Sequence, residues 1–91
     1  MAVPGDQLDA ALARVGARLK QLRQERSTTL AALSRATGIS VSTLSRLEAG
    51  LRRPTLELLL PIARAHQVSL DEIVGGLLVD DPRTHQGYEW L

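Results

Sequence analysis

The chain has 91 residues, which suffice for one small domain but leave no room for a second with its own core. It has no cysteine and no phenylalanine, so disulfides, thiolate metal sites and cysteine nucleophiles are excluded, and the core must be mainly aliphatic. No apolar run approaches the roughly 20 residues of a membrane span, and no signal-peptide pattern is present, so we expect a cytoplasmic protein with no membrane partner.

The net charge of +1 hides a strong separation of charge along the chain. Residues 14–64 contain ten arginines or lysines against three acidic residues, whereas the two ends together contain seven acidic residues and one arginine. A basic central segment flanked by acidic ends is typical of a domain that binds nucleic acid, although a solvated basic face has the same signature.

The first predicted helix follows Asp6, which is a good capping residue. Its apolar residues recur at helical spacing: Leu8, Leu12, Val15, Leu19 and Leu22. A second helix is predicted from Thr29, as the cap, to about Ala36, with Leu30 and Leu33 facing inward. Gly38 supplies the positive φ of the turn that ends it.

A third helix is predicted after Ser40, whose hydroxyl can accept a hydrogen bond from the free amides of the first turn. Leu44 and Leu47 face the core, Ile39 enters it from the preceding turn, and Gly50 ends the helix. The second and third helices therefore form a bihelical unit joined by a tight turn.

The last two predicted helices follow a basic loop, 51–54. Thr55 is the predicted cap of a helix whose residues available for burial are Leu56, Leu59, Leu60 and Ala63. Ser69 opens another helix through a capping box with Glu72, and Gly75-Gly76 is expected to end it.

The segment from Leu33 to Gly50, followed by Arg53-Pro54-Thr55 and by Val68 to Ile73, resembles the Xre, or lambda-repressor-like, helix-turn-helix family. The resemblance covers roughly residues 12 to 75 and combines several features rather than one short motif. It implies an all-α, five-helix lambda-repressor-like domain with the helix-turn-helix at the second and third helices, binding double-stranded operator DNA. We expect this domain to span residues 1–76, with 77–91 as a separate C-terminal segment.

The predicted third helix would present the face opposite Leu44 and Leu47 to DNA. The candidate base-reading residues on this face are Val41, Ser42, Ser45 and Arg46. Arg46 is the strongest of them, because a guanidinium can bond both O6 and N7 of guanine. Its alternative role is that of a surface arginine paired with a nearby acid.

Phosphate contacts are predicted for residues at the two ends of the same helix. They are Ser40, Thr43, Arg52 and Arg53. Ser40 also has a purely structural interpretation as a helix cap, and the two arginines have one as part of a solvated loop.

Glu48 would repel DNA if it faced the duplex. The family resemblance instead places it inward against an arginine of the first helix, which corresponds here to Arg23. We therefore predict a structural ion pair between Arg23 and Glu48.

Three positions depart from the family pattern. Leu30 replaces a glutamine that contacts phosphate in many members. Pro61 falls inside the fourth helical pattern and predicts a kink or a later start. His66-Gln67 replaces an aliphatic residue and a capping glycine, and we expect His66 to be a partly buried packing residue.

The C-terminal segment lacks helical periodicity and contains both aromatic residues, so it is a disordered tail, a dimerisation arm or the start of a further domain. The predicted homodimer interface comprises Leu77, Leu78, Val79, Tyr88, Trp90 and Leu91. An origin at the front of a regulator with a C-terminal cupin sensor is a second possibility suggested by resemblance.

The sequence predicts a dimeric, sequence-specific transcriptional regulator, a repressor, acting on half-sites roughly 34 Å apart. The alternative is an antitoxin-type or assembly module that binds a protein partner, with DNA binding secondary. An enzyme is disfavoured because His66 and His85 have no evident catalytic partner, and no metal-spaced cluster or phosphate-binding glycine loop points to a metal or cofactor.

Overall fold

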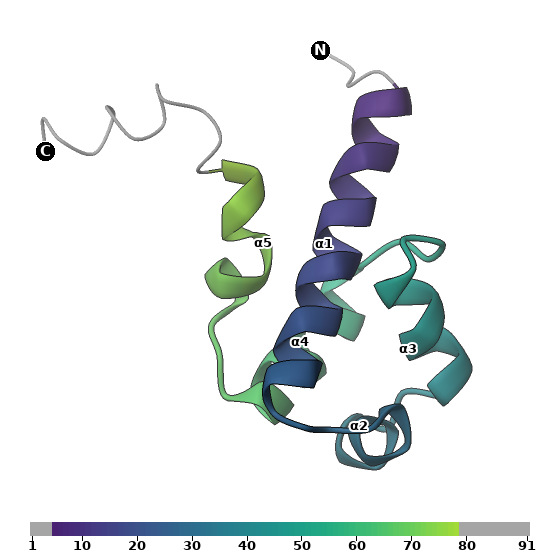
Figure 1. The fold of residues 1–91 in the computed structure, drawn as a ribbon, viewed down its shortest axis with the longest axis vertical. Coiled ribbons are helices and arrows are strands. Elements are labelled where there is room, and N and C mark those ends of the chain that lie inside the picture. The colour runs from purple at the N-terminus through teal and green to yellow at the C-terminus, as the bar shows by residue number, and fades with distance from the viewer. Residues whose placement is uncertain (1–4, 79–91) are drawn as a thin grey trace, which may run out of the picture.

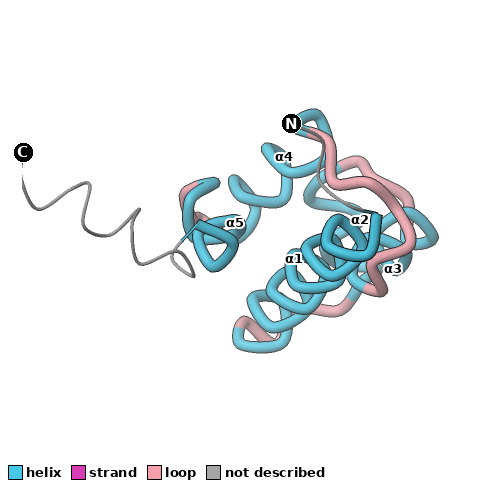
Figure 2. Tube along the Cα trace, turned by 90° about the horizontal axis from the view of Figure 1, so that it is seen from above, coloured by secondary structure: helices cyan, strands magenta, loops and turns pink. Residues whose placement is uncertain are grey.

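The computed structural model describes the backbone of residues 5–78 and the side chains of residues 9–74. Within these residues the fold is all helical (Figures 1 and 2). The five helices are α1 (Gly5–Glu25), α2 (Leu30–Thr37), α3 (Val41–Glu48), α4 (Leu56–His66) and α5 (Leu70–Leu78). The predicted fold class, with five helices, is confirmed.

The helices enclose the core as a closed ring of contacts. The longest helix, α1, packs against α3 on one side and α5 on the other (Figure 1). α2 joins α3 to α4, and α4 packs against α5, which completes the ring. This arrangement buries one face of every helix and leaves the opposite face of α3 on the surface.

The core is aliphatic, as the composition requires. Its buried members are Val15, Leu19, Leu22, Leu33, Leu44, Leu47, Leu59, Ile62, Ala63 and Ile73. In α1 the buried residues follow the predicted steps of four and three, which place them on one stripe of the helix.

α1 begins at Gly5, so Asp6 lies inside its first turn rather than at the cap position that the sequence predicts. An acidic residue is favourable anywhere in the first turn because it interacts with the positive end of the helix dipole. Its presence therefore does not fix the first residue of the helix.

α4 starts at Leu56, directly after Thr55, as the sequence predicts, and it continues through Pro61, so the alternative of a later start is wrong. Thr55 occupies the cap position but makes no side-chain capping hydrogen bond. Leu56 and Leu60, which are predicted to be available for burial, are 59% and 46% exposed. The buried face of α4 is formed instead by Leu59, Ile62, Ala63 and His66.

α5 continues to Leu78, so the prediction that Gly75-Gly76 ends this helix is wrong. Glycine lowers helix propensity by roughly 1 kcal/mol but retains its N–H, and it ends a helix only where it adopts a left-handed conformation. At the other end of α5, Ser69 Oγ accepts a hydrogen bond from Glu72 N at 3.3 Å, as the predicted cap requires.

Candidate DNA-binding surface

The corner between α2 and α3 is built by local hydrogen bonds that the sequence predicts. Thr29 Oγ1 accepts a hydrogen bond from Ala32 N at 3.0 Å, which caps α2. Gly38 adopts the left-handed conformation, with φ 77°, and donates its N–H to Ser34 O. The half-buried Ile39 then packs against the core. The turn therefore sets the direction in which α3 leaves α2.

The first turn of α3 is closed by Ser40 and Thr43. Ser40 Oγ accepts a hydrogen bond from Thr43 N at 3.1 Å and donates one to Thr43 Oγ1 at 2.9 Å. Ser40 is exposed and Thr43 is half-buried. Both predicted phosphate-contacting hydroxyls thus lie together at the N-terminus of α3, where free amides and the helix dipole favour an anion.

The outer face of α3 has the composition that the sequence predicts. Leu44 and Leu47 are 1% and 2% exposed and fix the inner face. The four candidate base-reading residues are exposed on the other side of the helix: Val41, Ser42, Ser45 and Arg46. The side chain of Arg46 is exposed and forms no hydrogen bond or ion pair with any other residue among 9–74, so its guanidinium is available to an external partner.

The loop between α3 and α4 extends this surface. Arg52 and Arg53 are both exposed, and the loop is anchored by a hydrogen bond from Leu51 N to Arg46 O at 2.8 Å. Gly50, with φ 76°, provides the left-handed turn that lets the chain leave α3. The two arginines therefore follow directly after the helix that carries Arg46.

Arg23 and Glu48 connect α1 to the C-terminal end of α3. Arg23 Nε and Nη2 donate hydrogen bonds to the two carboxylate oxygens of Glu48 at 2.6 and 2.9 Å, and Nη1 donates to Thr28 O at 2.9 Å. The side chains are only 13% and 9% exposed. The hydrogen bond with Glu48 raises the pKa of Arg23 above its ordinary value, despite the opposing effect of burial.

Gly16 makes a second connection between the same two helices, which the sequence pattern does not predict. A Cβ at this position would lie 2.5 Å from Leu47 O and 2.6 Å from Glu48 O. α1 can therefore approach the last turn of α3 this closely only because residue 16 has no side chain. A glycine inside a strong helical pattern was the available signal, but the partner backbone is distant in sequence.

His66 is more deeply buried than the sequence predicts, with 4% of its surface exposed. Its Nε2 atom has no hydrogen-bond partner among the described residues. Burial lowers the pKa of His66 below 6.5, the nearby Arg26 and Arg23 lower it further, and Glu48 opposes them. Arg26, the residue after α1, also donates a hydrogen bond from Nε to His66 O at 3.1 Å, which connects this turn to the end of α4.

The predicted dimer interface lies largely outside the described residues. Leu77 and Leu78 belong to the last turn of α5, but their side chains are not among those described, and Val79, Tyr88, Trp90 and Leu91 lie beyond the described backbone. That interface remains a prediction.

Of the described helices, none is both long and apolar enough to cross a membrane. No group of three or more histidine or acidic side chains within the described residues is arranged to hold a metal ion.

A profile of the helix-turn-helix family matches residues 19–73, from the last two turns of α1 into α5. The chain is 40% identical over 65 residues to the uncharacterized HTH-type transcriptional regulator YobD of Bacillus subtilis, a match that covers 71% of this chain and 56% of YobD. It is 38% identical over 60 residues to the HTH-type transcriptional regulator DdrOP3 of Deinococcus deserti, covering 66% of this chain and 46% of DdrOP3.

The match therefore spans about half the length of each of these curated relatives. The profile match at residues 19–73 includes α2, the turn and α3 in full. The chain belongs to the Xre-like helix-turn-helix family.

Proposed function

We propose that this chain is a sequence-specific DNA-binding transcriptional regulator that reads the major groove with α3. The observation that carries the proposal is the position of Arg46, exposed on the face of α3 opposite the buried Leu44 and Leu47. The names of both relatives, each an HTH-type transcriptional regulator, support the same class of function.

Arg46 is the proposed base reader of highest specificity, because its planar guanidinium can donate to O6 and N7 of one guanine. Val41 is proposed to contact a thymine methyl group, since its apolar side chain is 43% exposed at the start of α3. Ser42 and Ser45 are proposed to hydrogen-bond base edges, where a hydroxyl discriminates less because it both donates and accepts.

Ser40, Thr43, Arg52 and Arg53 are proposed to contact phosphates at the two ends of α3. Their positions at a helix N-terminus and in an exposed basic loop suit contacts that set the register of the protein on DNA. These contacts would contribute affinity and salt dependence, whereas Arg46 would contribute sequence preference.

The proposed active species is a homodimer that represses transcription by occupying an operator. A single recognition helix offers little contact area, and pairing two modules raises affinity through their effective concentration. Two half-sites would then be separated by about one helical turn, roughly 34 Å.

Selection of bound duplexes from a random DNA pool tests this function, with wild type and Arg46→Ala compared at a stated salt concentration. We expect an inverted repeat for wild type and loss of one guanine preference for Arg46→Ala. Arg14→Ala, which removes an exposed arginine from α1, is the matched control and should retain the preference. Weak, salt-sensitive binding without enrichment would refute sequence-specific recognition.

A protein-interaction module of the antitoxin type is the second candidate. The exposed leucines 51, 56 and 60, which are 79%, 59% and 46% exposed, favour this function because large apolar side chains at the surface often contact another protein. If Arg46→Ala leaves operator binding intact and substitution of Leu51 or Leu56 abolishes a protein complex, the second candidate replaces the first.

A further inference from the structure

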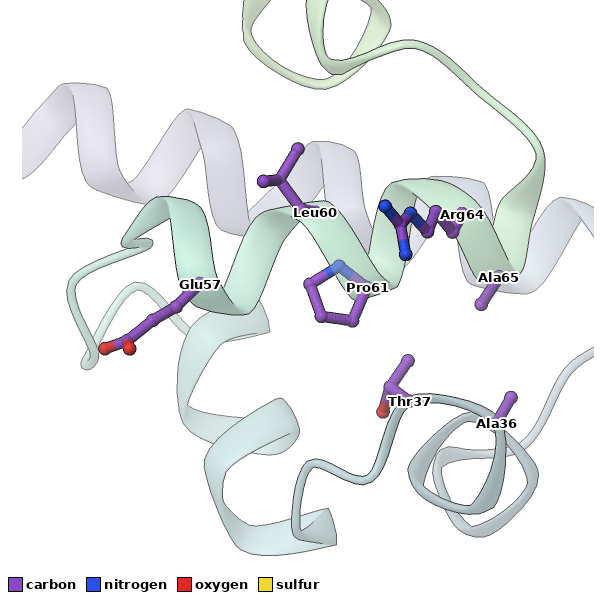
Figure 3. Close-up of a pocket in the computed structure, with 7 residues that line it drawn as sticks. All are labelled: Ala36, Thr37, Glu57, Leu60, Pro61, Arg64 and Ala65. Carbon is purple, nitrogen blue, oxygen red and sulfur yellow. The ribbon is translucent and has the colours of Figure 1, made fainter.

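The outer face of α4 borders an open groove that the DNA-reading surface does not use. The groove has a volume of about 650 Å³ and lies between α4 and the end of α2 (Figure 3). Its floor and walls are mainly apolar or small, with one acidic and one basic side chain: Ala36, Thr37, Glu57, Leu60, Pro61, Arg64 and Ala65.

The two charged side chains of this face lie seven residues apart in α4, which is nearly two helical turns, so they share one side of the helix. Glu57 and Arg64 are both exposed, and neither forms an ion pair or side-chain hydrogen bond within residues 9–74. Leu60 and Pro61 lie between them, and Leu60 is 46% exposed. The face thus carries an apolar centre with a negative charge at one end and a positive charge at the other.

This pattern is complementary to itself when a second α4 is laid across it in the opposite direction. A two-fold axis midway between Leu60 and Pro61 places Glu57 of each copy beside Arg64 of the other. The same axis places Leu60 against Pro61 of the other copy. In a closed two-fold interface each contact occurs twice, so one short face supplies two ion pairs around an apolar centre.

We infer that the α4 face, defined as Glu57, Leu60, Pro61 and Arg64, binds the same face of a second copy of this chain in antiparallel orientation. The inference rests on the proposed function in that it names a surface for the proposed homodimer. It differs from the interface predicted for residues 77–91, because it uses only described residues of α4. The short contact favours a weak, concentration-dependent dimer.

Charge reversal with the full chain tests the pairing directly. Glu57→Arg places two arginines at each end of the interface, and Arg64→Glu places two glutamates there, so each variant alone should weaken self-association by about tenfold or more. An equimolar mixture of the two variants restores both opposite-charge pairs, as does the double variant Glu57→Arg/Arg64→Glu. Sedimentation equilibrium over micromolar to millimolar concentrations measures each dissociation constant.

Arg14→Glu is the matched control, because it reverses an exposed arginine on α1 and should leave self-association unchanged. Rescue by the mixture supports the α4 pairing. The inference is overturned if the wild-type chain stays monomeric. It is also overturned if each single charge-reversal variant self-associates as strongly as the wild type. In both overturning cases duplex selection still reports whether Arg46 reads DNA, so failure of this inference and failure of the proposed function are distinguishable.

A cross-linking measurement keeps the inference testable if a reversed variant folds poorly. The chain has no cysteine, so Leu60→Cys introduces a single thiol near the proposed axis. A short bifunctional maleimide should link two copies of this variant, with circular dichroism confirming its helical fold, and should not link Arg14→Cys. Equal cross-linking of both variants would contradict the proposed position of the axis.

Discussion

The carboxylate of Glu48 on α3 is held by the guanidinium of Arg23 on α1 through two hydrogen bonds of 2.6 and 2.9 Å. The only acidic side chain of α3 is thereby directed toward the body of the domain, while Arg46, two residues earlier, is exposed. This pair fixes the end of α3 and removes a negative charge from the proposed DNA-reading face.

Arg23→Ala and Glu48→Ala should each lower the free energy of unfolding by about 3 kcal/mol, because each leaves the other charge largely buried and unpaired. Urea denaturation followed by circular dichroism measures the change. Glu25→Ala is the control, since Glu25 is 53% exposed and its oxygen lies 3.9 Å from Arg26, and it should have an effect of about 0.5 kcal/mol or less. Negligible effects of both test variants would show that the pair contributes little to stability.

Gly16→Ala should destabilise the domain although alanine is the better helix former. The added Cβ would lie 2.5 Å from Leu47 O, so α1 and α3 must separate. We expect the free energy of unfolding, measured by urea denaturation, to fall by about 2 kcal/mol or more, which is in the range of overpacked core substitutions. Ala17→Gly, at the adjacent exposed position, should cost only about 0.5–1 kcal/mol. A stabilised Gly16→Ala variant would be incompatible with the close approach.

Gln67→Gly should stabilise the domain. Gln67 ends α4 in the left-handed conformation, with φ 56°, which is unfavourable for a residue with a side chain and costs glycine little. The expected gain is about 1 kcal/mol in the free energy of unfolding. Gln24→Gly, in the last turn of α1, should instead lower the free energy of unfolding by up to about 1 kcal/mol. Destabilisation by Gln67→Gly would mean that the glutamine side chain contributes more than its backbone conformation costs.

His66 should make the stability of the domain sensitive to acid. Its pKa is lowered in the folded state by burial and by Arg26, so the unfolded chain binds the proton more readily. The contribution of His66 to the free energy of unfolding is complete above pH 6.5, the ordinary pKa of histidine. It is lost as the pH falls from there through the lower pKa of His66 in the folded state. The slope cannot exceed about 1.4 kcal/mol per pH unit for one proton.

Unfolding of wild type and His66→Leu at several pH values between about 7 and 5 checks this dependence. The free energy of unfolding of His66→Leu should change less with pH over this range than that of the wild type. His85 is present in both proteins and cancels in the comparison. Parallel profiles would mean that His66 does not protonate differently in the two states.

The elements that the sequence predicts correctly are those determined by neighbouring residues. The caps at Thr29 and Ser40 and the turn at Gly38 depend on hydrogen bonds within three or four residues, and each occurs as predicted. The burial of Leu44 and Leu47 follows from their helical spacing. The membership of an Xre-like family follows from the combination of these features with the helix that begins after Thr55.

The elements that the sequence does not predict depend on distant parts of the chain. Leu56 and Leu60 belong to an apolar run in which several helical faces look equally suitable, and only the packing of α4 on α2 and α5 selects the buried one. The role of Gly16 requires the carbonyl groups of α3, which lie about thirty residues further along the chain. The extent to which His66 is buried likewise depends on the surrounding helices.

The most direct test of the central claim is a double-mutant cycle between Arg46 and one guanine of the selected operator. Dissociation constants are measured for wild type and Arg46→Ala on the unmodified selected operator and on the same operator with 7-deazaguanine, which lacks the N7 acceptor, at that position. If Arg46 reads this base, the modified site should weaken wild-type binding by about 1–3 kcal/mol and should have little further effect on Arg46→Ala. Equal losses for both proteins at every guanine of the site would contradict base reading by Arg46.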